Sequence, residues 1–376
     1  MKLNYTQVLR TALPILLVSP ALGQGASFTG LGFLSLDNPF SECTGVSDDG
    51  RIVCGNGRGP GVPGEGMGFL WTSASGMVPL GNPPLTFGSP GGTATDLSGD
   101  GWVVAGRTKF DGLNSAGFNW NPIDTFTPLA PAVATSSASA SATNVDGSVT
   151  VGQTRHGGYV GFYSFEEATV WLDDGVIEGR AIGLFPGGGL SEARGVSADG
   201  SVVVGEAYRA YQEGVTAFRW DQTDGFVSLG DLPGGYHFSR ANAANADGSI
   251  IVGYGTVSFN SAGFTVDHRA CYWDEHGVHE LPNMPGSTGI TEATDISPDG
   301  RYIVGWARYL ATNVPVIWDD VHGIRNLYEV MAQEGIDVSS WGLGFATAVS
   351  ADGKTIVGHG RRGSPQTTEA WVCTLP

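Results

Sequence analysis

The sequence predicts an all-β protein, a single seven-bladed β-propeller of four-stranded blades. Three observations lead to this fold class. A unit of about fifty residues recurs seven times, and each unit carries the turn and strand signals of four short strands. Gly makes up 59 of the 376 residues, while only 15% of the residues are charged. One such unit cannot bury both of its faces, and seven units stacked around an axis can.

An Asp-Gly pair marks each unit, and a short apolar run ending in Gly follows it. The pairs begin at Asp49, Asp100, Asp146, Asp199, Asp247, Asp299 and Asp352, so successive spacings are 51, 46, 53, 48, 52 and 53 residues. Asp and Gly tolerate the positive φ of tight hairpin turns, so the seven pairs are predicted to be structural turns. Equivalent units place all seven turns on one rim. Turn chemistry explains each carboxylate, and we predict no metal site.

The fourth unit shows the four strands of a blade in order. Small residues over 192–197 predict an innermost strand at the crowded axis. The β-branched run 201–204 is typical of a strand buried on both faces. Residues 217–220, which end in Trp220, predict the third strand, and 226–229 the fourth. We expect the repeated Trp residues to pack one blade against the next.

The two ends of the chain predict how the ring closes. Residues 28–36 read as a lone fourth strand, and the chain stops within a third strand over 369–376. The N-terminal strand is therefore expected to complete the last blade, which removes an open sheet edge.

One segment departs from the strand pattern and predicts a short helix over 327–334. Asn326 is a suitable N-cap, and Glu329 stands at the third helical position, as in a capping box. Leu327, Val330 and Met331 share one face, which we expect to pack on the propeller. Gly335 provides the C-terminal stop.

The first residues are predicted to be a signal peptide spanning 1–23, followed by a single propeller domain over 24–376. Lys2 and Arg10 provide the positive region, and the apolar stretch 11–22 is too short to span a bilayer. No second long apolar run follows, so we expect a soluble exported protein without a membrane span. Export permits disulfides. Among the four cysteines, Cys43 and Cys54 flank one predicted hairpin and are a candidate pair.

Several motifs together resemble the bacterial extracellular HAF-repeat family. They are Ser-Ala-Asp-Gly-Ser-Val-Val-Val-Gly over 197–205, Ala-Phe-Arg-Trp over 217–220, Asp-Leu-Pro-Gly-Gly over 231–235, and the ending Glu-Ala-Trp-Val-Cys-Thr-Leu-Pro. The resemblance covers nearly the whole chain after residue 23. It implies a bacterial protein secreted or held at the exterior of the cell envelope, and it implies no activity, ligand or catalytic residue.

Charge and motif content limit the classes of function. The formal net charge of −18 argues against binding nucleic acid, whose phosphates require Lys and Arg. It also argues against an anionic membrane surface. His276 and His279 lack the acidic or Cys ligands that would complete a metal site. We find no catalytic constellation and no cofactor motif, and we expect a monomer.

The variable connections between second and third strands are where we expect binding residues, because variable loops on a rigid scaffold commonly bind ligands. The candidates on this rim are Tyr159, Phe162, Tyr163, Tyr208, Tyr211, Tyr309, Arg361 and Arg362. Aromatic rings with polar tips suit sugars or protein loops. The leading hypothesis is a non-catalytic binding module for a glycan or protein. The alternatives are a carbohydrate-active hydrolase or lyase on the same scaffold and a structural matrix or envelope component.

Overall fold

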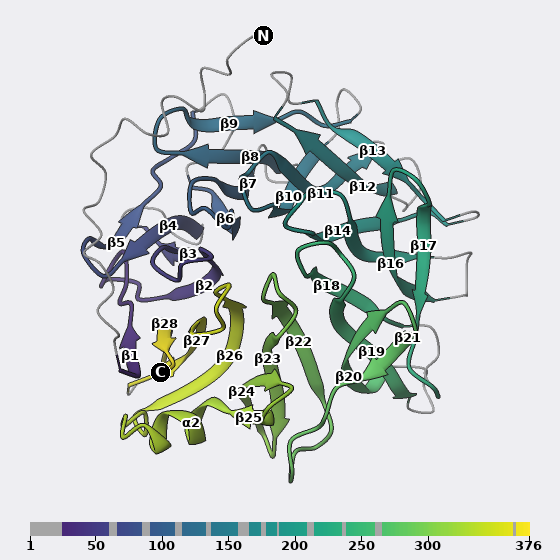
Figure 1. The fold of residues 1–376 in the computed structure, drawn as a ribbon. Helices are drawn as coiled ribbons and strands as arrows, with labels where there is room; N and C mark the ends of the chain where they lie inside the picture. Colours follow the sequence, from purple (N-terminus) through teal and green to yellow (C-terminus); the bar gives the residue numbers. More distant parts are fainter. Residues whose placement is uncertain are drawn as a thin grey trace.

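Seven four-stranded antiparallel sheets form a closed ring around a central axis (Figure 1). The computed structural model describes residues 25–59, 66–84, 91–109, 115–132, 137–156, 165–173, 178–185, 188–208, 214–234, 238–259, 265–363 and 366–376. The prediction of an all-β, seven-bladed propeller is confirmed. The predicted signal peptide lies outside the described residues.

The first four blades follow the chain from the axis outward. Blade 1 contains β2 (Ser41–Val46), β3 (Val53–Arg58), β4 (Gly66–Thr72) and β5 (Gly76–Pro79). Blade 2 contains β6 (Thr93–Leu97), β7 (Val104–Lys109), β8 (Ser115–Asn121) and β9 (Thr125–Leu129). Blade 3 contains β10 (Ser137–Thr143), β11 (Val149–His156), β12 (Phe165–Leu172) and β13 (Arg180–Gly183). Blade 4 contains β14 (Ser191–Val196), β15 (Val203–Tyr208), β16 (Val215–Asp221) and β17 (Gly225–Gly230).

The remaining blades repeat this order until the last, which takes its outer strand from the N-terminal segment. Blade 5 contains β18 (Arg240–Ala244), β19 (Ile251–Phe259), β20 (Thr265–Asp274) and β21 (Gly277–Glu280). Blade 6 contains β22 (Thr291–Ile296), β23 (Tyr302–Tyr309), β24 (Thr312–Asp319) and β25 (Gly323–Asn326). Blade 7 contains β26 (Trp341–Val349), β27 (Thr355–Arg362), β28 (Thr367–Thr374) and β1 (Ser27–Gly30).

The ring closes as the sequence predicts, because β1 pairs antiparallel with β28 and Phe28 lies opposite Cys373. The Phe28 ring meets Trp341 edge-on at a centroid distance of 5.2 Å and lies 6.0 Å from Trp371. Blade 7 is therefore held by both ends of the described chain, and Figure 1 shows β1 and β28 side by side.

A β-bulge in each innermost strand explains why the second strand always carries a Gly. In blade 4, Ala193 pairs with Gly205, and the next pair is Gly195 with Val204, so Arg194 is the extra residue. A Cβ on Gly205 would lie 1.9 Å from the carbonyl oxygen of Glu192. The observed β15 therefore continues through this Gly, whereas the apolar run alone predicted a strand ending before it.

The Asp-Gly turns use the positive φ at Gly only, which corrects part of the turn prediction. Gly200 has a φ of +77°, and no turn Asp is among the described residues with positive φ. Ser197 closes the turn, since its Oγ donates to Asp199 and accepts the N–H of Val202 at 2.9 Å. Ser or Asn plays the same part in all seven units.

The hydrophobic core is divided among the spaces between neighbouring blades. The buried Trp171 packs with residues of blades 2 and 3, and the buried Trp273 packs with residues of blades 4 and 5. The prediction that these residues serve packing is confirmed. Helix α2 (Leu327–Gln333) lies in the predicted position and is capped by Asn326. Its residues Leu327 and Met331 enter the core between blades 6 and 7.

The predicted disulfide between Cys43 and Cys54 is absent, and all four cysteines are free and buried. The two residues lie on opposite faces of the blade 1 sheet. Cys43 packs towards blade 7 with Val357, whereas Cys54 packs towards blade 2 with Val104. Nearness in sequence misled the prediction, because the strand pleat turns the two thiols apart. Within the described residues, no helix is long and apolar enough to cross a membrane.

Candidate functional site

The two faces of the ring differ in chemistry, and the Asp-Gly turns occupy one of them. Backbone hydrogen bonds join neighbouring turns, for example from Asp48 N to Gly99 O at 2.8 Å and from Ala351 N to Asp48 O at 3.0 Å. The prediction that the turns share one rim is thereby confirmed. Each turn Asp accepts a backbone N–H two residues later, at 2.9 to 3.0 Å. No group of three potential metal ligands occurs among the described residues.

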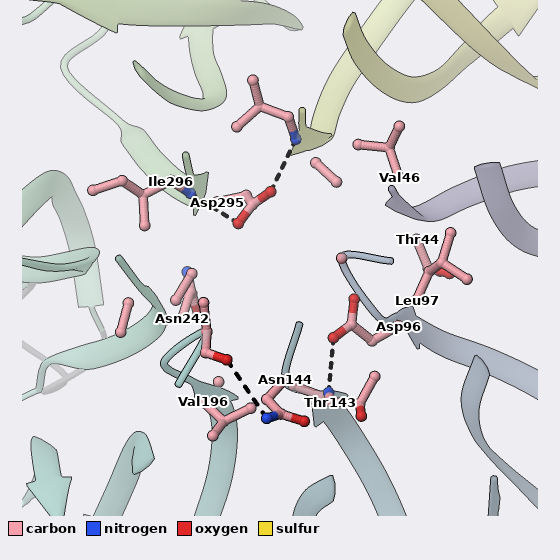
Figure 2. Close-up of a pocket in the computed structure, with 18 of the residues that line it drawn as sticks. Thr44, Val46, Asp96, Leu97, Thr143, Asn144, Val196, Asn242, Asp295 and Ile296 are labelled. Atoms are coloured by element: carbon pink, nitrogen blue, oxygen red, sulfur yellow. Dashed lines mark hydrogen bonds between the residues drawn. The ribbon is translucent and has the colours of Figure 1, made fainter. Parts of the chain in front are cut away.

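The central channel is lined by the innermost strands of all seven blades and has a volume of about 240 Å³ (Figure 2). The bulged residues on its wall are Thr44, Thr95, Ser141, Arg194, Asn242, Thr294 and Thr347. At the next position five blades have Gly or Ala, and blades 2 and 6 have Asp96 and Asp295. Its described lining includes no histidine.

Asp96 and Asp295 join neighbouring blades rather than facing an open substrate site. Asp96 accepts the N–H of Thr143 in blade 3, and Asp295 accepts the N–H of Val349 in blade 7, both at 2.9 Å. Burial raises the pKa of Asp96 to about 7 and that of Asp295 to about 6, although these backbone donors act in the opposite direction. Figure 2 shows both carboxylates turned towards these backbone groups.

The opposite end of the channel, here called the loop-side mouth, is surrounded by seven cross-strand pairs of variable residues. They are Glu42 with Asn56, Thr93 with Arg107, Ser139 with Gln153, Glu192 with Glu206, Arg240 with Tyr254, Glu292 with Trp306, and Phe345 with His359. In each blade one further pair, such as Ala193 with Gly205, separates the mouth pair from the bulge on the innermost strand. The repeat geometry therefore brings these side chains together at one end of the ring.

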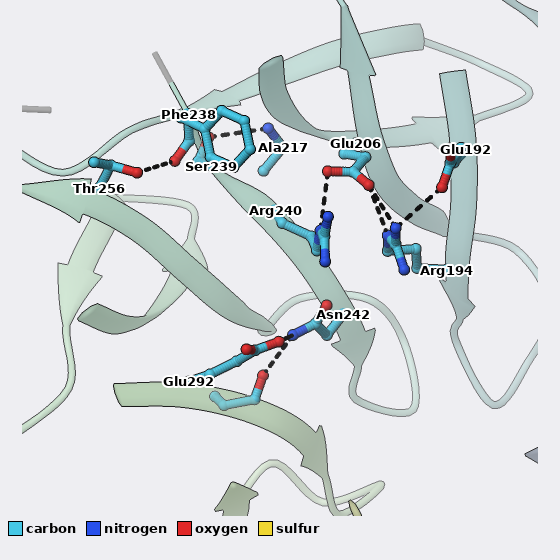
Figure 3. Close-up of polar contacts among 11 residues, drawn as sticks. Glu192, Arg194, Glu206, Ala217, Phe238, Ser239, Arg240, Asn242, Thr256 and Glu292 are labelled. Carbon is cyan, nitrogen blue, oxygen red and sulfur yellow. Dashed lines mark hydrogen bonds and ion pairs between the residues drawn. The ribbon is translucent and has the colours of Figure 1, made fainter. Parts of the chain in front are cut away.

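A charged cluster occupies the blade 4 and blade 5 side of this mouth (Figure 3). Glu206 accepts hydrogen bonds from Arg194 at 2.6 Å and from Arg240 at 2.9 Å. Arg194 also reaches Glu192 at 3.0 Å. Burial raises the pKa of Glu192, which the Arg194 charge partly offsets. Ion pairs hold these side chains in fixed positions, which is what recognition of a ligand requires.

Across blade 6 a similar arrangement fixes Glu292. Asn242 of blade 5 donates to the Glu292 carboxylate at 3.0 Å and to the carbonyl oxygen of Ala293 at 2.8 Å. Burial raises the pKa of Glu292, and the Asn242 hydrogen bond opposes this change. This carboxyl group is thus oriented beside the mouth by a neighbouring blade.

Aromatic rings continue the mouth from blade 5 to blade 7. Tyr254 lies 4.8 Å from His268, which lies 5.8 Å from Trp306. Trp306 is 5.6 Å from Phe345, and Phe345 stacks on His359 at 5.0 Å. All distances join ring centroids. The mouth therefore has a charged side and an aromatic side, called here the aromatic run.

A groove of about 630 Å³ extends from the end of the aromatic run over the loop side of blades 6, 7 and 1. We call it the blade 6–7 groove. Its lining includes Phe40, Glu42, Phe345, His359, Arg308, Arg361 and Tyr328. This volume is within the range of about 300–1,000 Å³ that is typical of ligand sites.

Half of the predicted rim candidates can be placed, and they do not form one site. Tyr159, Phe162, Tyr163 and Tyr211 lie outside the described residues. Tyr208 and Tyr309 are exposed at the loop-side ends of β15 and β23, in blades 4 and 6. Arg361 lines the blade 6–7 groove, whereas Arg362 hydrogen-bonds Glu369 at 3.3 Å.

Sequence reasoning missed the mouth pairs and the aromatic run, although a signal was present. Aligning the units on the Gly of the second strand shows one variable residue directly after it, such as Glu206, Trp306 or His359. A second variable position lies two residues before the bulged residue, as Glu192 lies before Arg194. Variation inside an otherwise regular repeat was the signal that set these positions apart from the turn and bulge residues.

Comparisons with known proteins show the fold alone. Neither a protein-family model nor a curated protein matches the sequence. An oligogalacturonate lyase from Vibrio parahaemolyticus is similar, with a TM-score of 0.54 and 12% identity over 94% of this chain and 98% of that one. A puromycin hydrolase gives a TM-score of 0.55 and 13% identity over 89% of this chain and 53% of that one. TolB from Acinetobacter baumannii gives a TM-score of 0.48 and 16% identity over 74% of this chain and 64% of that one.

Proposed function

We propose that the chain is an exported bacterial binding protein of the HAF-repeat type that recognises a glycan at its loop-side mouth. The aromatic run is the observation that carries this proposal. Sugar rings bind to aromatic faces beside fixed polar groups, and Trp306 lies between the polar Glu292 and the ring of Phe345. On the turn face, by contrast, the described turn carboxylates are engaged by backbone N–H groups.

The test is a depletion assay with the secreted protein, residues 24–376, and a panel of insoluble polysaccharides and bacterial envelopes. We expect at least one polysaccharide to remove the protein from solution. Replacing Trp306 with Ala is expected to weaken this binding about tenfold or more, because one ring contact and its buried area are lost. Trp102→Ala is the matched control, since Trp102 is a half-buried Trp that follows a turn on the opposite face.

Three outcomes would contradict the proposal. Equal binding by the Trp306→Ala and wild-type proteins would place the ligand elsewhere. Binding to a purified envelope protein but to no polysaccharide would make the ligand a protein. Self-association without any ligand, measured by light scattering, would indicate a structural component.

A hydrolase or lyase is the second candidate, and one observation favours it. Burial raises the pKa of both Glu192 and Glu292 at the mouth, and a raised pKa suits a carboxyl group that must donate a proton. Soluble sugars released during the depletion assay would identify an enzyme. Their loss in Glu192→Gln or Glu292→Gln would then identify the acid.

A further inference from the structure

The blade 6–7 groove contains two arginines that have no acidic partner within the described ranges, in a chain with far more acids than bases. The sequence has 37 Asp and Glu against 19 Lys and Arg. Arg308 and Arg361 are exposed and line the groove. Among the described residues no carboxylate pairs with either side chain, whereas Arg194 and Arg240 beside the same mouth are both paired. Two free guanidinium groups at one groove are suited to a ligand carboxylate.

The floor of the groove adds an aromatic platform and an unsatisfied polar atom. His359 stacks on Phe345 with an interplanar angle of 27°. The Nδ1 atom of His359 is buried and has no hydrogen-bond partner among the described residues. Burial lowers the pKa of His359 to about 4, so the ring is neutral near pH 7 and adds no charge to the groove.

Glu42 is the single carboxylate among the described lining residues. Burial raises the pKa of Glu42, and a hydrogen bond from Asn56 acts in the opposite direction. The hydroxyl group of Tyr328 is already engaged, because it donates to Trp341 O and accepts from Leu343 N. Tyr328 therefore offers the groove its ring, while Asn313, Gln366 and Thr368 provide further polar groups.

The groove is lined by both interior and innermost strands. Its lining residues on β23, β24, β27 and β28 belong to interior strands with a partner on each side, whereas Glu42 on β2 and Phe345 on β26 belong to innermost strands with one free edge. Peptides that add to a sheet need a free strand edge with unpaired backbone groups, and the interior strands offer none. The aromatic and polar side chains of this lining suit a ligand with rings and hydroxyl groups.

We propose that the blade 6–7 groove binds a uronate residue of an acidic glycan, with Arg308 and Arg361 holding its carboxylate and the Phe345–His359 stack supporting its ring. This inference rests on the proposed function and names the ligand class for it. The loop-side mouth, which shares Phe345 and His359 with the groove, then contacts the neighbouring sugars of the same chain.

The experiment is calorimetric titration of the secreted protein with trimers of glucuronate, galacturonate and mannuronate. Each trimer is paired with its carboxyl-reduced form, which differs only in having a primary alcohol. We expect at least one uronate trimer to bind and its reduced form to bind at least about tenfold more weakly, because charge-assisted hydrogen bonds are lost. Arg308→Ala and Arg361→Ala should each weaken binding by at least about tenfold.

The control variant is Arg301→Ala, which removes an exposed arginine after the Asp299 turn and should leave binding unchanged. Equal affinity for a trimer and its reduced form, or full binding by the Arg308→Ala/Arg361→Ala double variant, would overturn the uronate site. The proposed function would stand in that case. If no trimer binds while a polysaccharide still depletes the wild-type protein but not Trp306→Ala, the groove inference fails alone. If neither trimers nor polysaccharides bind, both proposals fail.

Discussion

We expect the half-buried carboxylates Asp96 and Asp295, which line the channel, to make the stability of the protein depend on pH. Asp96 has a folded-state pKa of about 7, against about 3.9 in an unfolded chain. The folded protein therefore holds this proton more tightly, so its contribution to stability is full below about pH 4 and is lost as pH rises to about 7. The difference of about three pKa units at Asp96 corresponds to a change of about 4 kcal/mol in the free energy of unfolding. The rise of the Asp295 pKa to about 6 corresponds to a change of about 3 kcal/mol.

Replacing Asp96 with Asn removes this titration. The amide also disturbs the hydrogen bond to Thr143 N, but that cost is the same at every pH. We expect the unfolding free energy of Asp96→Asn, relative to wild type, to increase by on the order of 4 kcal/mol between pH 4 and pH 8. Urea unfolding followed by Trp fluorescence at each pH measures this difference.

The control is Asp320→Asn, which removes an exposed charge and should give a curve parallel to the wild type. A curve for Asp96→Asn that is also parallel to the wild type between pH 4 and pH 8 would refute the reasoning. It would mean that the backbone donors stabilise the ionised carboxylate enough to cancel its burial.

Three further predictions concern the fold. Gly205→Ala should lower the free energy of unfolding by more than about 4 kcal/mol, measured by thermal unfolding, because its Cβ would lie 1.9 Å from a carbonyl oxygen. Gly76→Ala, at a φ of +66° with open space around it, should lower it by only about 1–2 kcal/mol. Equal losses in the two variants would count against the bulge explanation. Phe28→Ala should cost about 2 kcal/mol and speed hydrogen exchange in blade 7 first, unless closure by β1 contributes nothing. The four buried thiols should resist alkylation in the folded protein and all react after unfolding without reductant, whereas a disulfide would leave two unreactive.

The elements that repeat were predictable from the sequence, and the features that depend on register were not. The Asp-Gly turns, the strand order, the closing strand and α2 each follow from local signals that recur or stand alone. The bulge at Arg194 has no local signal, because it depends on pairing with Gly205 across the sheet. The same holds for Cys43 and Cys54, which are close in sequence and on opposite faces of one blade.

The candidate site was predicted less well for a related reason. Signals along one chain favour long, variable loops, but the two described Tyr candidates, Tyr208 and Tyr309, lie exposed at strand ends in separate blades. The loop-side mouth is assembled instead from single residues spaced about one repeat apart. Trp306 and Phe345 meet only because blades 6 and 7 are neighbours in the ring.

The seven cross-strand pairs at the loop-side mouth also have a consequence for how such a protein can change. The turn and bulge glycines fix the backbone of every blade, whereas the paired residues already range from Ser and Gln to Glu, Trp and His. Under the proposed function, the residues that would set specificity are therefore different from the glycines that set the fold of each repeat. A library that randomises only these pairs should yield folded propellers with new ligands, and a duplicated blade would bring its own recognition residues with it.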